Sequence, residues 1–133
     1  MTTPTTTTLG TRMNAALSLV TGAVLTVAPG TISDRLGLDI GAWLRTLGIA
    51  LLAHAAWLEW VTRRPQPAPW VRLNLALITP YPVAMLAIAA SPVVGPTSGK
   101  AVLMVDGVCV TIVAVAQWRG LRQVAHTAAT LPA

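Results

Sequence analysis

Four long apolar runs divide this chain, and Pro, Gly or charged residues separate each run from the next. The runs extend over residues 13–28, 42–60, 70–90 and 101–118. A helix rises about 1.5 Å per residue and needs about 17–25 residues to cross about 30 Å of hydrocarbon, so each run is at or near the length of a membrane span. The sequence therefore predicts an all-α polytopic membrane protein, a bundle of four transmembrane helices.

The composition agrees with this fold class. The chain is 54% hydrophobic and 10% charged, and its mean hydropathy is +0.67. A chain of this composition is not expected to be soluble in water and is typical of a membrane protein. We expect one transmembrane domain, residues 12–122, between a disordered tail at residues 1–11 and a flexible tail at residues 123–133. Its net charge of +5 does not indicate nucleic acid as a partner, because the cations flank apolar runs instead of clustering with aromatic residues.

The cations near the ends of the runs are unevenly distributed. One side of the predicted bundle carries Arg12, Arg63, Arg64, Arg72, Arg119 and Arg122, and the other carries Arg35, Arg45 and Lys100. Since cations accumulate on the cytoplasmic side of a membrane protein, we expect both termini in the cytoplasm. Arg outnumbers Lys eight to one, which is typical of GC-rich bacteria. The predicted location is therefore the bacterial cytoplasmic (inner) membrane.

Small and polar residues recur on one face of the first run. Ser18, Gly22 and Thr26 are spaced four residues apart and share one side of a helix. Small residues at this spacing let two helices approach closely in a membrane. We therefore interpret the three residues as a helix-packing stripe, with a polar path for a solute as the alternative.

Two opposite charges lie near the outer ends of the second and fourth runs, Arg45 and Asp106. A charged group within the bilayer costs about 2.5–3.5 kcal/mol on insertion scales, so each needs a partner. The sequence predicts an intramembrane ion pair between them, with Asp34 and Asp39 as other candidates for Arg45. The pair would either couple protons or substrate near the outer mouth or fix the second helix against the fourth.

A second polar group is predicted at the inner end. Glu59 precedes Arg63 by four residues, a spacing at which side chains on a helix meet. Asn14 and Gln117 are expected at the same level. Trp60 beside Glu59 is typical of an aromatic belt at the membrane surface.

The third run contains Pro80 and Pro82 in mid-span. Each proline removes a backbone donor and frees a carbonyl one turn earlier, so the sequence predicts a kink near residues 76–79. Broken helices line binding sites in some transporters, and they also occur for shape alone.

The sequence offers little for catalysis or metal binding. Cys109 is the single cysteine, so no intramolecular disulfide is expected, and it is predicted to pack as a small hydrophobe. His54 is predicted to be a hydrogen-bonded packing residue, and His126 lies beyond the last run. We therefore expect no enzymatic activity, no cofactor and no metal.

Several short segments carry a resemblance to a known group of proteins: Asn14, Leu17–Leu19, Thr21–Gly22, Ala28–Gly30, Leu44–Arg45, Gly48 and Gln117–Arg122. With these segments the chain resembles a widespread group of bacterial four-helix membrane proteins, similar in broad layout to the DoxX-like families. DoxX-like proteins are associated with redox chemistry and membrane complexes. The resemblance carries no catalytic residue onto this chain.

The function expected from the sequence is that of an accessory or assembly subunit that packs against a second copy of itself or a larger membrane complex. One alternative is a small oligomeric transporter or channel. Four-helix exporters of this size have a carboxylate in the first span, and the first run here has none. A membrane redox-complex subunit is the second alternative.

Overall fold

The computed structural model describes the backbone of residues 6–64, 68–95 and 97–130, and the side chains of residues 8–64, 68–95 and 97–123. All regular elements in these ranges are helices: α1 (Thr6–Val27), α2 (Pro29–Leu36), α3 (Gly41–Thr62), α4 (Ala68–Ile78), α5 (Pro80–Ala90) and α6 (Thr97–Thr130). The predicted all-α class is confirmed.

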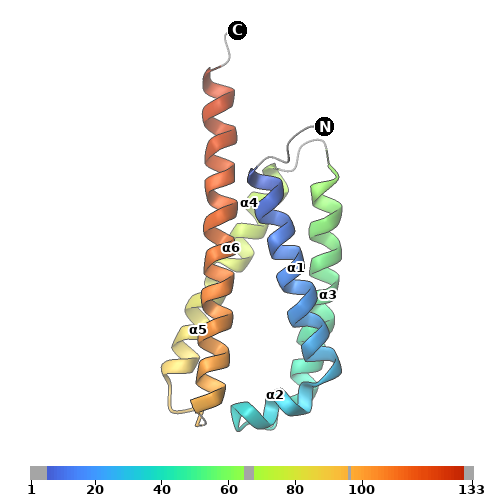
Figure 1. The fold of residues 1–133 in the computed structure, drawn as a ribbon, viewed down its shortest axis with the longest axis vertical. Coiled ribbons are helices and arrows are strands. Elements are labelled where there is room, and N and C mark those ends of the chain that lie inside the picture. Colours follow the sequence, from blue (N-terminus) through green and yellow to red (C-terminus); the bar gives the residue numbers. More distant parts are fainter. Residues whose placement is uncertain (1–5, 65–67, 96, 131–133) are drawn as a thin grey trace.

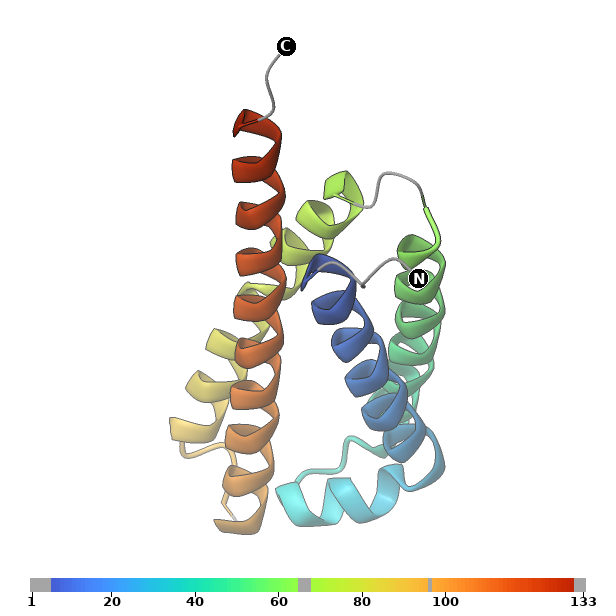
Figure 2. The same ribbon diagram turned by 45° about the horizontal axis from the view of Figure 1, so that its top comes forward.

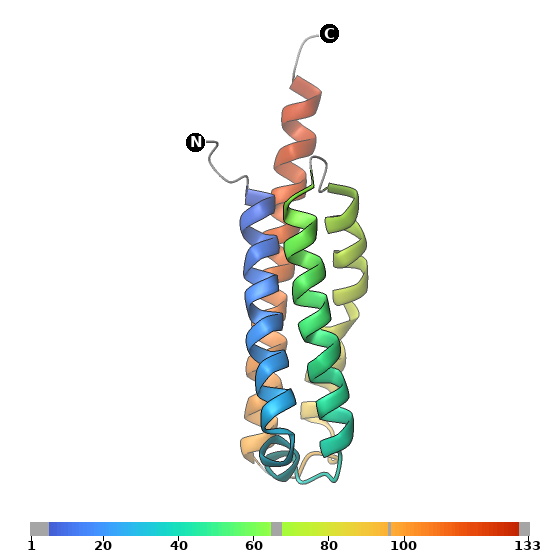
Figure 3. The ribbon, with the colours of Figure 1, turned by 90° about the vertical axis from the view of Figure 1, so that its right-hand side faces the viewer.

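Four long rods run side by side, namely α1, α3, α4 with α5, and α6, while α2 lies across one end of the bundle (Figure 1). Helix α1 packs chiefly on α3 and α6, and α5 packs on α6 (Figure 3). Helices α3 and α5 are not among the pairs that pack together. The start of α1 and the end of α6 lie at the same end of the bundle, opposite to α2 (Figure 1). We call this the terminal end and the other the α2 end.

The described chain has two helical segments that are long and apolar enough to cross a membrane. They are residues Ala68–Ala90, with 23 residues, and Thr97–Gln123, with 27. A third span is counted if α1 and α2 form one unit, although the chain bends by 90° between them. Helix α3 has 22 residues but is not among these spans, and it carries Arg45, His54 and Glu59. The structure thus has two to three apolar candidates where the sequence predicted four.

Helix α1 begins earlier than predicted. Thr6 is already helical, whereas residues 1–11 were expected to be disordered; residues 1–5 lie outside the described chain. The reason is packing on α6. Gly10 and Thr11 are buried, and a Cβ at Gly10 would lie 3.1 Å from the backbone nitrogen of Gln117. Helix α6 likewise continues to Thr130, into the predicted tail 123–133, whose last three residues are outside the described chain.

Helix α2 lies between the first two apolar runs of the sequence. Pro29 stands in its first turn, where the missing N–H of proline costs nothing. Gly37 ends it with φ 70°, a left-handed conformation that glycine adopts without steric cost. The Ser33 hydroxyl accepts a 3.0 Å hydrogen bond from the backbone N–H of Ile40 and fixes the turn into α3.

The end of α2 meets the start of α6 (Figure 2). A Cβ at Gly99 of α6 would lie 2.6 Å from the carbonyl oxygen of Arg35, so only glycine permits this approach. Helix α2 therefore closes the bundle at this end by bridging from α1 to α6.

The predicted stripe Ser18, Gly22 and Thr26 lies against α3. A Cβ at Gly22 would come within 2.8 Å of the carbonyl oxygen of Gly48, and a Cβ at Gly48 within 2.6 Å of Thr26 Oγ1. The backbones of α1 and α3 therefore approach at these two glycines. This contact supports the helix-packing interpretation of the stripe.

The third rod is interrupted where the prolines predict it. Helix α4 ends at Ile78 and α5 begins at Pro80, with Thr79 between them. The backbone N–H and the hydroxyl of Thr79 both donate to the carbonyl of Leu75, at 3.0 and 2.6 Å, and tie the residue at the break to α4. Pro82 is buried against α6, where its carbonyl oxygen faces Gly107.

Candidate functional site

A chain of hydrogen bonds crosses the bundle and takes one side chain from each of α1, α3, α4 and α6. Ser18 Oγ lies 3.1 Å from His54 Nδ1, and His54 Nε2 lies 2.8 Å from Asn74 Oδ1. The Asn74 amide then donates a 3.0 Å hydrogen bond to Gln117 Oε1. We call these four residues the polar network.

The hydrogen-bonding partners of His54 decide which of its ring nitrogens carries the proton. Asn74 Oδ1 only accepts, so His54 Nε2 donates, and His54 Nδ1 can then accept from the Ser18 hydroxyl. The neutral imidazole satisfies both contacts in this arrangement. This agrees with the prediction that His54 is a hydrogen-bonded packing residue.

Three of the four residues of the polar network are buried, and His54 is half-buried. Asn74 and Gln117 are 0% exposed, and Ser18 is also buried. A buried amide without partners costs about 1–3 kcal/mol, and each bond here relieves part of that cost. Among the described residues two buried amide nitrogens have no hydrogen-bond partner, Gln117 Nε2 of the network and Asn14 Nδ2 outside it.

A second polar contact joins α5 to α6. The Tyr81 hydroxyl donates a 2.6 Å hydrogen bond to Asp106 Oδ2. Bonds of this length are typical of a hydroxyl on an ionised carboxylate. No cation among the described residues lies within ion-pair distance of Asp106.

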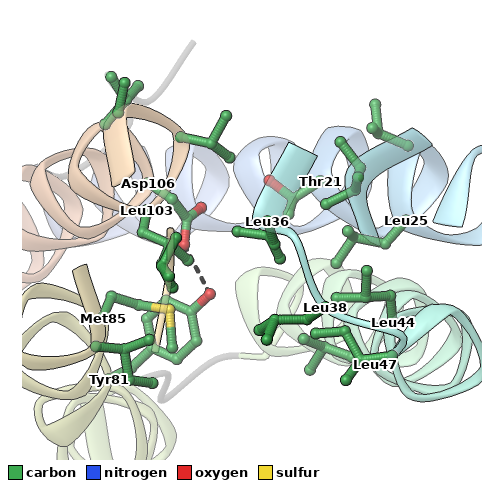
Figure 4. A pocket seen from close by; sticks show the side chains of 18 of the residues that line it. Thr21, Leu25, Leu36, Leu38, Leu44, Leu47, Tyr81, Met85, Leu103 and Asp106 are labelled. Carbon is green, nitrogen blue, oxygen red and sulfur yellow. Dashed lines mark hydrogen bonds between the residues drawn. The ribbon is translucent and has the colours of Figure 1, made fainter. Parts of the chain in front are cut away.

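A cavity of about 790 Å³ lies between the α1–α3 pair and the α5–α6 pair. Its wall is apolar except at a few side chains, which include Thr21, Tyr81 and Asp106. Figure 4 shows Tyr81, Met85, Leu103 and Asp106 on one wall, facing leucines of the other helices. Sites for small molecules in proteins are of this kind, about 300–1,000 Å³ and apolar with a few placed polar groups.

A smaller cavity of about 280 Å³ adjoins the first. It is more polar, because Asn14, Ser18 and His54 contribute to its wall. Both cavities are lined by Leu17, Thr21, Tyr81 and Asp106. The Tyr81–Asp106 pair therefore stands where an apolar chamber meets a polar one.

The predicted ion pair between Arg45 and Asp106 does not form. Arg45 is on the exposed face of α3, whereas the buried residues Leu44 and Gly48 of that helix face inward. Helices α3 and α6 are not among the pairs that pack together. Asp106 instead finds its partner on the adjacent helix α5, in Tyr81.

The predicted inner-end cluster divides into two parts. Glu59 and Arg63 form the expected pair, with 3.1 Å between Oε1 and Nη2, and their side chains are 43% and 74% exposed. An exposed pair of this kind contributes about 0.2–1 kcal/mol. Gln117 belongs to the buried polar network and Asn14 to the wall of the smaller cavity, so neither joins Glu59.

Two important residues were not singled out from the sequence. Asn74 is an amide inside an apolar run, and such a group must find partners when buried. Tyr81 is the single tyrosine of the chain and stands between two prolines. Both signals were present, but neither indicated which helix supplies the partner.

Metal-ligating side chains do not gather in the described part of the chain, where no group of three His, Cys, Asp or Glu could hold an ion. Cys109 is a free thiol in the wall of the larger cavity. His126 falls outside the described side chains. Comparison with protein-family models, curated proteins and solved structures found no match for this chain.

Proposed function

We propose that this chain is a multi-pass membrane protein in which α1, α3, the α4–α5 rod and α6 all cross the bilayer, with both termini in the bacterial cytoplasm. The exposure of apolar side chains supports this. Only 17% of the residues in each of the two most apolar windows are buried, and Val27 and Val83 are 83% and 68% exposed. Lipid covers such surfaces, whereas water would leave them as aggregation sites.

Tryptophans near both ends of the rods support the same arrangement. Trp43 and Trp60 lie about 25 Å apart along α3, close to the thickness of the hydrocarbon core. At the terminal end Trp60 packs edge-on against Trp70, and the Arg64 guanidinium lies 3.7 Å above the Trp60 ring. Tryptophan and arginine are typical anchors at the membrane surface.

Within the membrane the proposed function is to bind an apolar molecule in the larger cavity. The observation that carries this proposal is the cavity itself, about 790 Å³ with an almost wholly apolar wall and one polar pair, Tyr81 and Asp106. Helices α3 and α5 are not among the pairs that pack together, and the cavity lies between them. A molecule dissolved in the bilayer would fill it.

Binding of decanol by the full chain in phosphatidylcholine nanodiscs tests this function. Equilibrium dialysis against protein-free nanodiscs should give saturable excess binding. Leu103→Trp places a large side chain in the cavity and should weaken binding about tenfold or more, by analogy with the cost of overpacking. Ile112→Trp on the outer face of α6 is the matched control and should bind as the wild type does. Absence of saturable binding, or equal loss in both variants, would refute the function.

A small transporter is the second candidate, and the adjoining polar chamber favours it. The two cavities share Tyr81 and Asp106, so a bound molecule would have a polar space beyond its apolar one. Uptake of decylammonium into proteoliposomes, compared with protein-free liposomes, tests transport. The accessory-subunit, redox-subunit and DoxX-like hypotheses stay predictions from the sequence.

A further inference from the structure

Asp106 is a carboxylate set within an apolar wall. It is one of four acidic residues in the chain, and the other three, Asp34, Asp39 and Glu59, are near helix ends. Asp106 lies well inside α6 and lines both cavities. Its charge is therefore the dominant electrostatic feature of the cavity.

The surroundings of Asp106 leave part of its bonding capacity unused. Tyr81 donates to Oδ2, and Oδ1 has no hydrogen bond among the described residues. The one ion pair of the described structure is Glu59 with Arg63, so Asp106 has no cationic partner there. A carboxylate in a membrane interior without such a partner is costly, and a bound cation would reduce this cost.

We propose that the cavity recognises an amphiphile with a single apolar chain and a cationic head group, and that Asp106 pairs with that head. This rests on the proposed function of the cavity. The apolar chain lies among residues such as Leu25, Leu44 and Met85, and the head lies at Asp106. Tyr81 is a positioning residue, because its hydrogen bond to Oδ2 fixes the carboxylate and leaves Oδ1 available to the ligand.

The adjoining smaller cavity fits a polar head group. Asn14, Ser18 and His54 line it, and the Asn14 amide and the Ser18 oxygen can each bond water or a donor of the head group. A neutral alcohol could also donate to Asp106, but it would not compensate the charge. An anionic head would be repelled at this position. The charge of Asp106 thus selects among molecules whose chains are alike.

Three probes with one chain length test this inference, namely decylammonium, decanol and decanoate. With the full chain in phosphatidylcholine nanodiscs, equilibrium dialysis should give tighter binding of decylammonium than of decanol, and the weakest binding of decanoate. Asp106→Asn keeps the size of the side chain and an acceptor for Tyr81 but removes the charge. It should weaken decylammonium binding about tenfold or more and decanol binding much less.

A second variant separates the charge of Asp106 from the hydrogen bond that Tyr81 makes to it. Tyr81→Phe removes the hydroxyl that fixes the carboxylate and should reduce, but not abolish, the preference for decylammonium over decanol, since the charge of Asp106 remains. Equal loss of both probes in Asp106→Asn, or no preference for the cation in the wild type, would overturn the inference. Saturable decanol binding that Leu103→Trp weakens would in that case still support the proposed function. If none of the three probes binds, both proposals are overturned.

Discussion

The Tyr81 hydroxyl donates a 2.6 Å hydrogen bond to Asp106 Oδ2, and this contact ties α5 to α6 where the two cavities meet. It takes the place of the ion pair that the charges of the sequence suggested between Arg45 and Asp106. Its effect on stability can be measured independently of any ligand.

Tyr81→Phe should lower the free energy of unfolding by about 1.5–3 kcal/mol, the range for a hydrogen bond to a charged group. Because Tyr81 and Asp106 are in contact, the double change with Asp106→Ala, which removes the acceptor, should cost less than the sum of the single changes. Arg45→Ala with Asp106→Asn should instead be additive, since the two residues do not meet. Denaturant unfolding in mild detergent measures both cycles. Strict additivity for Tyr81 and Asp106 would contradict the contact.

The crossing of α1 and α3 gives a second prediction. Gly22→Leu introduces a side chain where a Cβ would already lie 2.8 Å from the Gly48 carbonyl oxygen, and overpacking of this kind costs about 1–3 kcal/mol. Val24→Leu on the exposed side of α1 is the control and should change stability little. Thermal unfolding in detergent compares the two. Equal tolerance at both positions would mean that the stripe faces lipid.

The polar network gives a third prediction. Asn74→Leu removes the central amide and leaves His54 Nε2 and Gln117 Oε1 without their partner. Each buried group left without a hydrogen bond lowers the free energy of unfolding by about 1–3 kcal/mol. Adding Gln117→Met removes one of the stranded groups, so the double variant should lose less than the sum of the single losses. A loss equal to that sum would show that the two amides are not coupled.

Topology is tested by reporter fusions in bacteria. Fusions after Arg64 and after the last residue should read cytoplasmic, because the terminal end carries most of the cations. Fusions after Asp34 or Ser98 should read periplasmic. A periplasmic reading at the C-terminus would refute the proposed orientation and the even number of crossings.

Features within one helix were accessible from the sequence because helix geometry fixes them. The spacing of Ser18 and Gly22 placed them on one face, the spacing of Glu59 and Arg63 made them neighbours, and Pro80 located the break. The apolar runs were long enough to locate the four rods. Their hydropathy could not decide how many of them cross a membrane.

Contacts between helices depended on the tertiary structure. A sequence gives the angular position of a side chain on its own helix, but not the rotation and axial shift of one helix against another. The partner of Asp106 was therefore not predictable, nor was the network through His54 and Asn74. Helix α2 formed because Pro29 and Gly37 bound it and α6 offers Gly99 as a close contact. The sequence alone determined where the apolar rods of the chain lie, whereas the packing of α1, α3, α5 and α6 decided that a cavity with one carboxylate lies between them.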